Sequence, residues 1–429
     1  MSLKSADPEL HNLLEKERIR QQESLELIAS ENYTSQAVLD ALGSIATNKY
    51  AEGYPGKRYY GGNTEIDKIE TLCMNRALKA FGLDEAEWAV NVQPYSGSPA
   101  NMAVYVGLLQ PHDVIMGLEL TAGGHLTHGF KTAKRRVSAT SIFFESEHYG
   151  LTPEGLIDYD AMAKKALDVK PKLLICGYSA YSRDLDYARF RTIADSVGAL
   201  LLCDMAHFSG FVATGLLNNP FKYCDVVTTT THKTLRGPRS GLIFCRRALA
   251  QRINDAVFPG LQGGPHENVI AAVATQLRAV ASPEFKTYMQ QVQTNARALA
   301  AALQSRGHTI MTGGTDNHIV LVNMKPLGLT GAQAELALER AYISVNKNTL
   351  VGDKSALHPS GIRIGTPAVT TRGLNETDMS WVADVIHRVL RHAATISAAP
   401  DYKERIQKST ELHLIQEEVR VKMRGFSSL

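Results

Sequence analysis

Short apolar runs alternate with amphipathic segments between about residues 85 and 260 of the chain. The segment YARFRTIADSVG at 187–198 has helical spacing and ends in glycine, which is typical of a helix lying between two strands. Strand, helix and strand in this order predict a mainly parallel sheet. The runs that predict strands are VIMGL at 114–118, KLLICG at 172–177, ALLLCD at 199–204, DVVTTTTH at 225–232 and GLIFC at 241–245.

The pattern changes after Pro265, where longer helical segments begin. The longest of them, at 284–307, has the length to join two domains. A smaller mixed unit follows, with a strand HIVLVNM, a helix AQAELALERA, an extended IRIGTPA and a helical region from about 377. We therefore expect an N-terminal helical arm (1–48), a large α/β domain (49–284) and a small C-terminal α+β domain (285–429).

The composition is that of an ordinary globular protein, with 44% hydrophobic and 21% charged residues and a net charge of +3 over 429 residues. The compact basic run KTAKRR at 131–136 has no aromatic residues among its charges, so a nucleic-acid partner is not expected. No apolar run approaches the ~18 residues that a membrane helix needs. The first 22 residues carry four acidic and four basic side chains and do not have the pattern of a targeting signal.

The five cysteines stand at scattered spacings without a Cys-x-x-Cys pair. This pattern indicates reduced thiols rather than a disulfide framework or a zinc site. Together with the N-terminal sequence, it leads us to expect a cytoplasmic protein.

Lys233 lies within VVTTTTHKTLRGPRSG, residues 226–241. The threonines favour a strand before it, and Gly237 and Pro238 predict a turn after it. A lysine at a strand end can have its amine pKa lowered by burial and by neighbouring cations, which suits covalent bonding to a carbonyl. An exposed surface lysine is the alternative reading, so the surrounding residues must decide.

Asp204 ends the preceding strand, at the edge of a parallel sheet where ligands bind. A carboxylate at the base of a pocket can pair with the pyridinium nitrogen of pyridoxal phosphate and keep the ring protonated. A helix cap is an equally open role for Asp204. His207 could reach the same pocket or be a capping or core residue.

Two further segments could contact a ligand. In PYSGSPAN, Ser98 is expected as a helix N-cap with Pro99 at the first helical position, and the free amides there would attract a phosphate. In NKYAEGYPGKRYYGG, residues 48–62, Glu52 lies among four tyrosines and four glycines and could act as an acid or base. A capped helix without a ligand and a surface loop with glycine turns are the alternatives.

Arg363 lies in an extended apolar stretch, where an unpaired guanidinium would be costly to bury. A ligand carboxylate and an internal salt bridge would each explain it. His125 and His128 stand three apart in GGHLTHG without a third ligand nearby, which makes a poor metal site. We therefore expect no metal and interpret His125 as a residue that stacks on a ring or handles a proton.

Together these segments closely resemble the serine hydroxymethyltransferase family, pyridoxal-phosphate enzymes of the aspartate aminotransferase fold. The fold implied is fold type I, with a mainly parallel, seven-stranded mixed sheet between helices and a smaller α+β C-terminal domain. The motifs that carry the resemblance run in order along almost the whole chain: SLELIASENYTS, NKYAEGYPGKRYYGG, PYSGSPAN, GGHLTHG, DMAHFSG, VVTTTTHKTLRGPRSG, FPGLQGGPH, NKNT and SGIRIGTPA.

The resemblance implies that Lys233 carries pyridoxal 5'-phosphate covalently, that Asp204 pairs with its ring nitrogen and that His125 stacks on its ring. The remaining implied cofactor contacts are Ser179 and His207 at the phenolic oxygen, Ser98 and the backbone of Gly97 at the phosphate, and Gly263 from a second subunit. The resemblance therefore also implies a homo-oligomer with a dimer as its smallest active form, and it leaves dimer and tetramer open.

For the substrate, the resemblance implies that Arg363 and Ser30 hold the amino-acid carboxylate and that Glu52 moves protons. Tyr50 and Tyr60 would reach in from the partner chain, Thr230 would lie near the substrate, Arg239 near the entrance, and His232 would affect turnover. The implied folate contacts are Leu120, Gly124, Leu126, Asn348 and the Ser355 region, flanked by Tyr59 and Phe258.

The implied reaction transfers the β-carbon of L-serine to tetrahydrofolate, giving glycine and 5,10-methylenetetrahydrofolate reversibly. One alternative is a folate-independent threonine or β-hydroxy-amino-acid aldolase of the same fold. A second alternative, of a different class, is a catalytically silent scaffold or RNA-binding relative.

Overall fold

The computed structural model describes residues 2–353 and 357–426 and divides the chain into two compact units. The large unit comprises Thr34–Gln290, and the small unit comprises Met1–Tyr33 with Gln291–Leu429. The boundary on the C-terminal side falls inside helix α12 (Pro283–Gln304), a few residues beyond the position expected from the sequence. Residues 2–33 group with the small unit, which differs from the separate N-terminal arm expected for 1–48.

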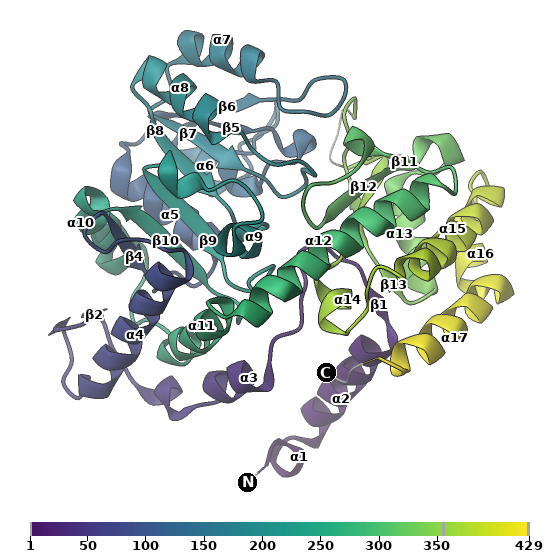
Figure 1. The fold of residues 1–429 in the computed structure, drawn as a ribbon, viewed down its shortest axis with the longest axis horizontal. Helices are drawn as coiled ribbons and strands as arrows, with labels where there is room; N and C mark the ends of the chain where they lie inside the picture. Colours follow the sequence, from purple (N-terminus) through teal and green to yellow (C-terminus); the bar gives the residue numbers. More distant parts are fainter. Residues whose placement is uncertain (1, 354–356, 427–429) are drawn as a thin grey trace. The chain divides into compact units, whose positions relative to one another are not determined.

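A seven-stranded mixed sheet organises the large unit, in the order β4-β10-β9-β8-β7-β5-β6 (Figure 1). The strands β5, β6, β7, β8 and β9 are parallel to one another, while β10 pairs antiparallel with both β9 and β4. The predicted parallel sheet is therefore confirmed. Its strands are β4 (Trp88–Asn91), β5 (Val114–Leu118), β6 (Glu145–Tyr149), β7 (Leu173–Gly177), β8 (Leu200–Asp204), β9 (Val226–Thr230) and β10 (Gly241–Arg246).

Alternate residues of these strands pack against helices on the two faces of the sheet, because side chains of a strand point alternately up and down. Leu173 and Ile175 of β7 belong to the core cluster formed with α5 (Gly97–Leu108) and α10 (Ala250–Asp255). On the other face, Cys203 of β8 lies 3.8 Å from the hydroxyl of Tyr187 at the start of α8 (Tyr187–Val197). With both faces covered, the carboxyl ends of the parallel strands are the edge where a site can form.

The other elements of the large unit surround this sheet, together with a short hairpin of β2 (Gly53–Tyr54) and β3 (Lys57–Arg58). Helix α8 ends at Gly198, whose φ of 66° suits the left-handed helix cap that the sequence predicts. The remaining helices are α3 (Gln36–Leu42), α4 (Thr64–Ala80), α6 (Ala139–Phe143), α7 (Tyr159–Val169), α9 (Ser209–Thr214) and α11 (Glu267–Val280).

The small unit is built on a four-stranded antiparallel sheet of β11 (Thr309–Ile310), β12 (Ile319–Asn323), β15 (Gly361–Gly365) and β14 (Asn346–Asn348). Helices α13 (Gly331–Arg340) and α15 (Met379–Thr395) share its hydrophobic core. The strand, helix, strand and final helices predicted from the sequence are confirmed. The other elements are α1 (Leu3–Ala6), α2 (Pro8–Glu23), α14 (Pro367–Thr371), α16 (Tyr402–Lys408) and α17 (Thr410–Arg424).

The N-terminal segment joins the small unit through backbone pairing and buried charge. Strand β1 (Leu25–Glu26) pairs parallel with β13 (Ile343–Ser344), and Leu25 and Leu27 enter the core. The Arg372 guanidinium donates hydrogen bonds to the carbonyls of Gln21, Gln22 and Met423, which ties the end of α2 to the end of α17. A two-residue strand gives no periodic signal, so the sequence did not reveal this attachment.

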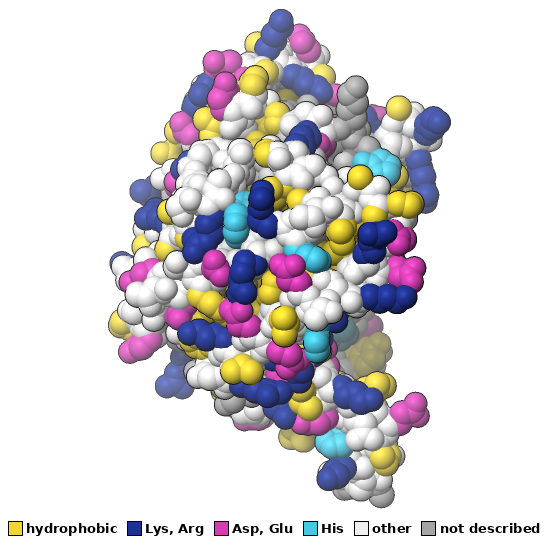
Figure 2. Space-filling view, turned by 90° about the vertical axis from the view of Figure 1, so that its right-hand side faces the viewer, with side chains coloured by type: hydrophobic (Ala, Val, Ile, Leu, Met, Phe, Trp, Pro, Cys, Tyr) yellow, Lys and Arg dark blue, Asp and Glu magenta, His cyan; other side chains and the backbone are white. Residues whose placement is uncertain are grey.

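The surface carries both signs of charge. Figure 2 shows lysine and arginine side chains interspersed with aspartate and glutamate over the face in view. Among the described residues, no helix combines the length and the hydropathy needed to cross a membrane. All five cysteines are buried and unbridged, as the sequence indicates.

Candidate active site

Lys233 follows the end of β9, next to the strand that Asp204 terminates. Strand β8 ends at Asp204 and β9 ends at Thr230, and the two strands are paired. The Lys233 amine donates a hydrogen bond of 3.0 Å to the Thr230 hydroxyl. The position at the carboxyl edge of the sheet that the sequence predicts for Asp204 and Lys233 is therefore confirmed.

A closed turn fixes the backbone around Lys233. The amide of Gly237 donates to the carbonyl of Thr231 at 2.7 Å, and the Thr231 hydroxyl donates to the carbonyl of Pro238 at 2.5 Å. A Cβ at position 237 would lie 2.8 Å from that Thr231 oxygen, so glycine is required there. The turn after Lys233 is therefore closed on Thr231, the residue that directly follows β9.

The Asp204 carboxylate is buried, and three donors satisfy it. His128 Nε2 lies 3.0 Å and Asn101 Nδ2 2.9 Å from Oδ2, and the amide of Ala206 donates to Oδ1 at 3.1 Å. Burial by itself raises the pKa of the Asp204 carboxyl, but the hydrogen bonds from His128 and Asn101 outweigh it and hold the pKa well below its ordinary value. Asp204 is therefore a buried anion at neutral pH.

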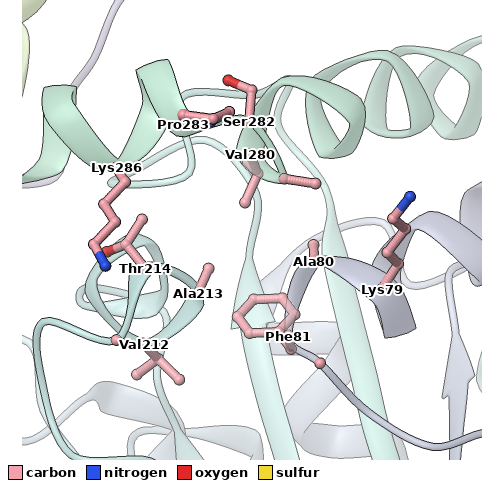
Figure 3. Close-up of a pocket in the computed structure, with 13 residues that line it drawn as sticks. Lys79, Ala80, Phe81, Val212, Ala213, Thr214, Val280, Ser282, Pro283 and Lys286 are labelled. Carbon is pink, nitrogen blue, oxygen red and sulfur yellow. The ribbon is translucent and has the colours of Figure 1, made fainter.

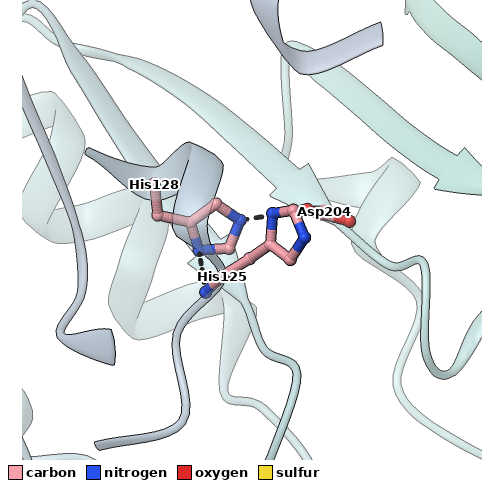
Figure 4. Close-up of side chains that lie close together, drawn as sticks. All are labelled: His125, His128 and Asp204. Carbon is pink, nitrogen blue, oxygen red and sulfur yellow. Dashed lines mark hydrogen bonds and ion pairs between the residues drawn. The ribbon is translucent and has the colours of Figure 1, made fainter. Parts of the chain in front are cut away.

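His128 connects Asp204 to the loop that carries His125 (Figure 4). The backbone amide of His125 donates to Nδ1 of His128, which leaves the proton of His128 on Nε2, facing Asp204. The ring nitrogens of the two histidines and a carboxylate oxygen of Asp204 lie within 4.8 Å of one another. The sequence argument that no third ligand lies near the histidines is therefore wrong, since folding brings Asp204 to them. Both nitrogens of His128 are already occupied by hydrogen bonds.

The His125 ring is neutral at physiological pH. Burial, with the nearby His128 and Lys233, lowers the pKa of His125 to about 4, against the opposing charge of Asp204. The Thr127 amide donates to Nδ1 of His125 at 3.2 Å and fixes the ring on its own loop. A neutral flat ring can lie against an aromatic ligand without adding charge.

Sequence reasoning missed His128, Asn101 and Thr228, which support Asp204. The Thr228 hydroxyl donates to Oδ1 of Asn101 at 2.7 Å, which directs the amide nitrogen of Asn101 at the carboxylate. Asn101 lies on α5 and Thr228 on β9, so no local spacing connects them to Asp204. The two histidines of GGHLTHG did draw attention to His128, but only as a possible metal ligand.

Glycines bring the loops after β5, β7 and β8 into contact. The amides of Ser179 and Ala180 both donate to the carbonyl of Gly123, whose φ is 104°. A Cβ at Gly124 would lie 2.0 Å from the carbonyl oxygen of Leu118. Ser179 is thus held beside the His125 loop, while the carbonyl of His207 accepts the Thr234 hydroxyl at 3.0 Å, next to Lys233.

Helix α5 starts earlier than the sequence suggested. Its N-cap is Ser96 and its first residue is Gly97, so the expectation that Ser98 is the N-cap and Pro99 the first residue is wrong. Proline is still tolerated at Pro99 because amides of the first turn have no intrahelical partner. A Cβ at Gly97 would lie 2.8 Å from Cγ2 of Thr230, so the start of the helix lies against the end of β9. The Ser96 side chain does not cap these amides.

His232 is half-buried between Lys233 and the solvent-exposed Arg239. No donor or acceptor among the described residues reaches its Nδ1. Burial, followed by the charges of Lys233 and Arg239, lowers the pKa of His232 to about 3. The ring is neutral and keeps one ring nitrogen for a ligand.

Glu52 lies beside the glycine loop at 262–264 of the same chain. A Cβ at Gly263 would be 3.2 Å from the Glu52 carboxylate, and one at Gly264 would be 3.3 Å from the ring of Tyr50. Tyr50 is 55% exposed and meets Tyr60 edge to face at 5.0 Å. Tyr59, 73% exposed, meets Phe258 in the same manner at 5.5 Å.

Leu120 and Leu126 begin short 3₁₀ turns on either side of His125. The predicted residues Arg363, Ser30 and Asn348 belong to the small unit, and Ser355 lies outside the described residues. Arg363 is in β15, buried, and donates from Nε to Asn346 at 2.9 Å; burial lowers its pKa to about 10.

Pyridoxal phosphate fits the donor set of the large unit. The site offers a buried anion for a ring nitrogen (Asp204), an amine for a carbonyl carbon (Lys233) and a neutral ring for stacking (His125). The uncapped start of α5 suits a phosphate, because its amides point outward and the helix dipole favours an anion. These groups are of the kinds that the cofactor requires.

A separate cavity of about 650 Å³ in the large unit is lined by none of these residues. The helices α4, α9 and α11 end at this cavity, and Figure 3 shows Lys286 pointing toward Thr214 at the end of α9. Lysines there complement the negative ends of the three helices. The cavity is lined by residues 79–82, 212–215, 280–283 and Lys286.

A seven-stranded mixed sheet with a lysine and a buried aspartate at neighbouring strand ends, accompanied by a smaller C-terminal unit, defines fold type I of the pyridoxal-phosphate enzymes. Residues 3–386 match the family model described as serine hydroxymethyltransferase. The chain belongs to this family.

The curated relatives agree with this assignment. "Serine hydroxymethyltransferase 3, chloroplastic" of Arabidopsis thaliana is 59% identical over 90% of this chain and 74% of its own length. The cytosolic serine hydroxymethyltransferase of Oryctolagus cuniculus is 57% identical over 90% of this chain and 83% of its own. The serine hydroxymethyltransferase of Bombyx mori is 53% identical over 99% of this chain and 96% of its own.

Proposed function

We propose that this chain is an enzyme that transfers the hydroxymethyl group of L-serine to tetrahydrofolate, giving glycine and 5,10-methylenetetrahydrofolate reversibly. The observation that carries the proposal is the arrangement of Lys233, Asp204 and His125 at the strand ends of a chain that belongs to this family. Pyridoxal 5'-phosphate is the proposed cofactor and supplies, when bound, a place for the electrons of the broken carbon–carbon bond.

The residues of the large unit have separate tasks in this proposal. Lys233, directed by Thr230, would bind the cofactor covalently. The Asp204 anion would keep a proton on the ring nitrogen, and His125 would provide a neutral ring for stacking. The backbone at Gly97 and the Ser98 side chain bind the phosphate at the start of α5, and Ser179 and His207 bind the phenolic oxygen.

Substrate binding is proposed to involve Arg363 and Ser30 for the amino-acid carboxylate. Glu52 takes and returns the proton of the serine hydroxyl. The proposed folate contacts are Leu120, Gly124, Leu126, Asn348, Ser355, Tyr59 and Phe258.

The decisive experiment follows glycine formation from serine with and without tetrahydrofolate. The wild-type enzyme should require the folate, and Lys233→Ala should lose rapid turnover and the visible absorbance of the bound cofactor. Serine cleavage at the same rate without folate would instead favour the aldolase. Protein that stays colourless with added pyridoxal phosphate would favour the silent scaffold.

We further propose a homo-oligomer in which Glu52, Tyr50, Tyr60 and Gly263 serve the site of the partner subunit. The exposure of Tyr50 and Tyr60 supports this, since large aromatic surfaces are enriched at interfaces. Mixing Lys233→Ala with Glu52→Gln subunits, each of which has little activity alone, should restore about a quarter of wild-type activity, because half of the dimers are hybrids and each hybrid has one intact site. No recovery after subunit exchange would contradict shared sites.

The five buried thiols support a reducing compartment, for which we propose the cytoplasm. Among the relatives, one is named cytosolic and another chloroplastic.

A further inference from the structure

Arg58 holds the backbone on both sides of Glu52. Its Nη1 donates 2.7 Å to the carbonyl of Ala51 and 2.9 Å to the carbonyl of Gly53. The amide of Tyr59 donates to the carbonyl of Glu52 at 3.0 Å. Every carbonyl from 51 to 53 is thus fixed by a donor at 58 or 59.

Two acidic residues of α4 fix the guanidinium in turn. Nε donates to Asp67 at 2.8 Å and Nη2 to Glu70 at 2.7 Å, and the two acids lie three residues apart on one helix face. The Arg58 side chain is 4% exposed. A planar fork of donors can meet two carboxylates and two carbonyls together, whereas the single ammonium of lysine cannot.

Gln93, which lies two residues after the end of β4, makes a second connection between the Glu52 segment and α4. Its Nε2 donates to the carbonyl of Gly53 and to Glu70, both at 2.9 Å. Its own carbonyl accepts Nε2 of Gln262 at 2.9 Å, and Oε1 of Gln262 accepts the amide of Tyr95 at 3.1 Å. The Glu52 segment, the 262–264 loop and the start of α5 are therefore linked by one hydrogen-bonded network.

Glycine at position 53 makes this arrangement possible. Its φ is 98°, and a Cβ there would lie 2.3 Å from the carbonyl oxygen of Lys57. The hairpin closes tightly and returns Arg58 to the carbonyls at 51 and 53.

We propose that Arg58 is a positioning residue for Glu52: fixed on Asp67 and Glu70, it holds the Ala51 and Gly53 carbonyls and so sets where the Glu52 carboxylate lies. The inference rests on the proposed proton transfer by Glu52. Arg58 contacts neither cofactor nor substrate in this account and acts only through the backbone that carries Glu52.

The test compares Arg58→Lys with the wild type, with Glu52→Gln and with the double variant, using Lys57→Gln on the exposed neighbouring position as the matched control. Arg58→Lys should lower kcat by about tenfold or more, since positioned acid–base groups contribute about 10²–10⁴, while the KM for serine changes by less than about threefold. In the Glu52→Gln background the same substitution should lower kcat by less than about twofold.

A second measurement does not depend on activity. In the cofactor-free protein, amide hydrogen exchange of segment 50–60 should accelerate in Arg58→Lys and stay unchanged in Lys57→Gln. Should Arg58→Lys not fold, Gln93→Met removes one donor to Gly53 at nearly the same volume and should give the same pattern with smaller amplitude.

Two results would overturn the inference: unchanged exchange in segment 50–60, or an equal fold-loss of kcat in both Glu52 backgrounds. A Glu52→Gln enzyme with wild-type kcat would instead refute the proposed role of Glu52, and with it the functional part of the inference, even if exchange accelerates. The failure of the proposed proton transfer is thereby distinguished from the failure of the Arg58 clamp.

Discussion

Asp204 and Glu267 are buried carboxyl groups of the same unit, 7% and 1% exposed, yet their protonation differs. Asp204 receives three hydrogen-bond donors, and its pKa lies well below the ordinary value. No donor from the described residues reaches either oxygen of Glu267, and burial together with the charge of Glu70 raises its pKa to about 8. Burial is common to both, so the donors decide the charge.

The location at a helix terminus does not alter this outcome. Glu267 is the first residue of α11, where the helix dipole favours an anion. Its nearest cation, Arg58, lies 3.9 Å away and is already bound to Asp67 and Glu70. One arginine serves three acids, and burial raises the pKa of Glu70 as well as that of Glu267.

The largest expected effect comes from removing the charge that the Asp204 donors stabilise. Asp204→Asn keeps the volume but cannot hold a proton on a ring nitrogen, so kcat should fall by at least about a hundredfold. Steady-state kinetics at saturating pyridoxal phosphate would measure this, with the thermal midpoint as the control for folding. A variant that keeps a third of the wild-type kcat would remove Asp204 from the catalytic account.

Next in size is the pH dependence that Glu267 contributes to stability. The folded state keeps a proton on Glu267 up to about pH 8, whereas the unfolded state releases it near the ordinary glutamate pKa of 4.5. The free energy of unfolding should therefore fall as the pH rises through this window, by roughly 2.5 kcal/mol between pH 6 and 8.5. Urea unfolding of Glu267→Gln should lack this slope, and an identical slope in both proteins would contradict the raised pKa of Glu267.

A smaller effect is expected from removing one Asp204 donor. Asn101→Leu deletes the 2.9 Å bond and leaves His128 and Ala206 as donors. The cofactor-free protein should lose about 2 kcal/mol of unfolding free energy, which is typical of a buried hydrogen bond to a charged group. Denaturant titration measures this, and wild-type stability would mean that the remaining donors suffice.

The smallest effect is expected at the surface of helix α4, the helix that also carries Glu70. Glu65 pairs with Lys68 at 2.8 Å, and both side chains are more than half exposed, at 77% and 68%. Glu65→Gln should change the unfolding free energy by about 0.5 kcal/mol or less, because water screens the pair. It also serves as the matched control for Glu267→Gln, and a change as large as that variant's would show that burial is not the deciding difference.

Five of the seven strands of the large sheet were predicted from the sequence, because each is a short apolar run bounded by turn residues. The strands β4 and β6 were not predicted, and β6 has the mostly polar sequence ESEHY. The predicted strands also placed Asp204 and Lys233 correctly at strand ends, and the carboxyl ends of parallel strands lie at one edge of the sheet. It misplaced the start of α5, because Ser96 and Ser98 are both good cap residues in sequence and only the backbone angles distinguish them.

The residues that hold the site residues in place could not be predicted from the sequence. Asn101 and Thr228 reach Asp204 from α5 and β9, and Arg58 meets Ala51, Asp67 and Glu70 across a hairpin and a helix. The sequence also did not predict that the N-terminal segment attaches to the small unit through β1, because a strand of two residues has no hydrophobic periodicity.

The sequence by itself determined the sheet, the edge that bears the chemistry and, through ordered motifs, the family. These depend on local periodicity and on residue types at fixed spacing. Only the tertiary structure decided the charge of the buried acids and the supports of Glu52, because a carboxyl group's pKa depends on which donors folding brings within 3 Å, and those donors come from distant parts of the chain.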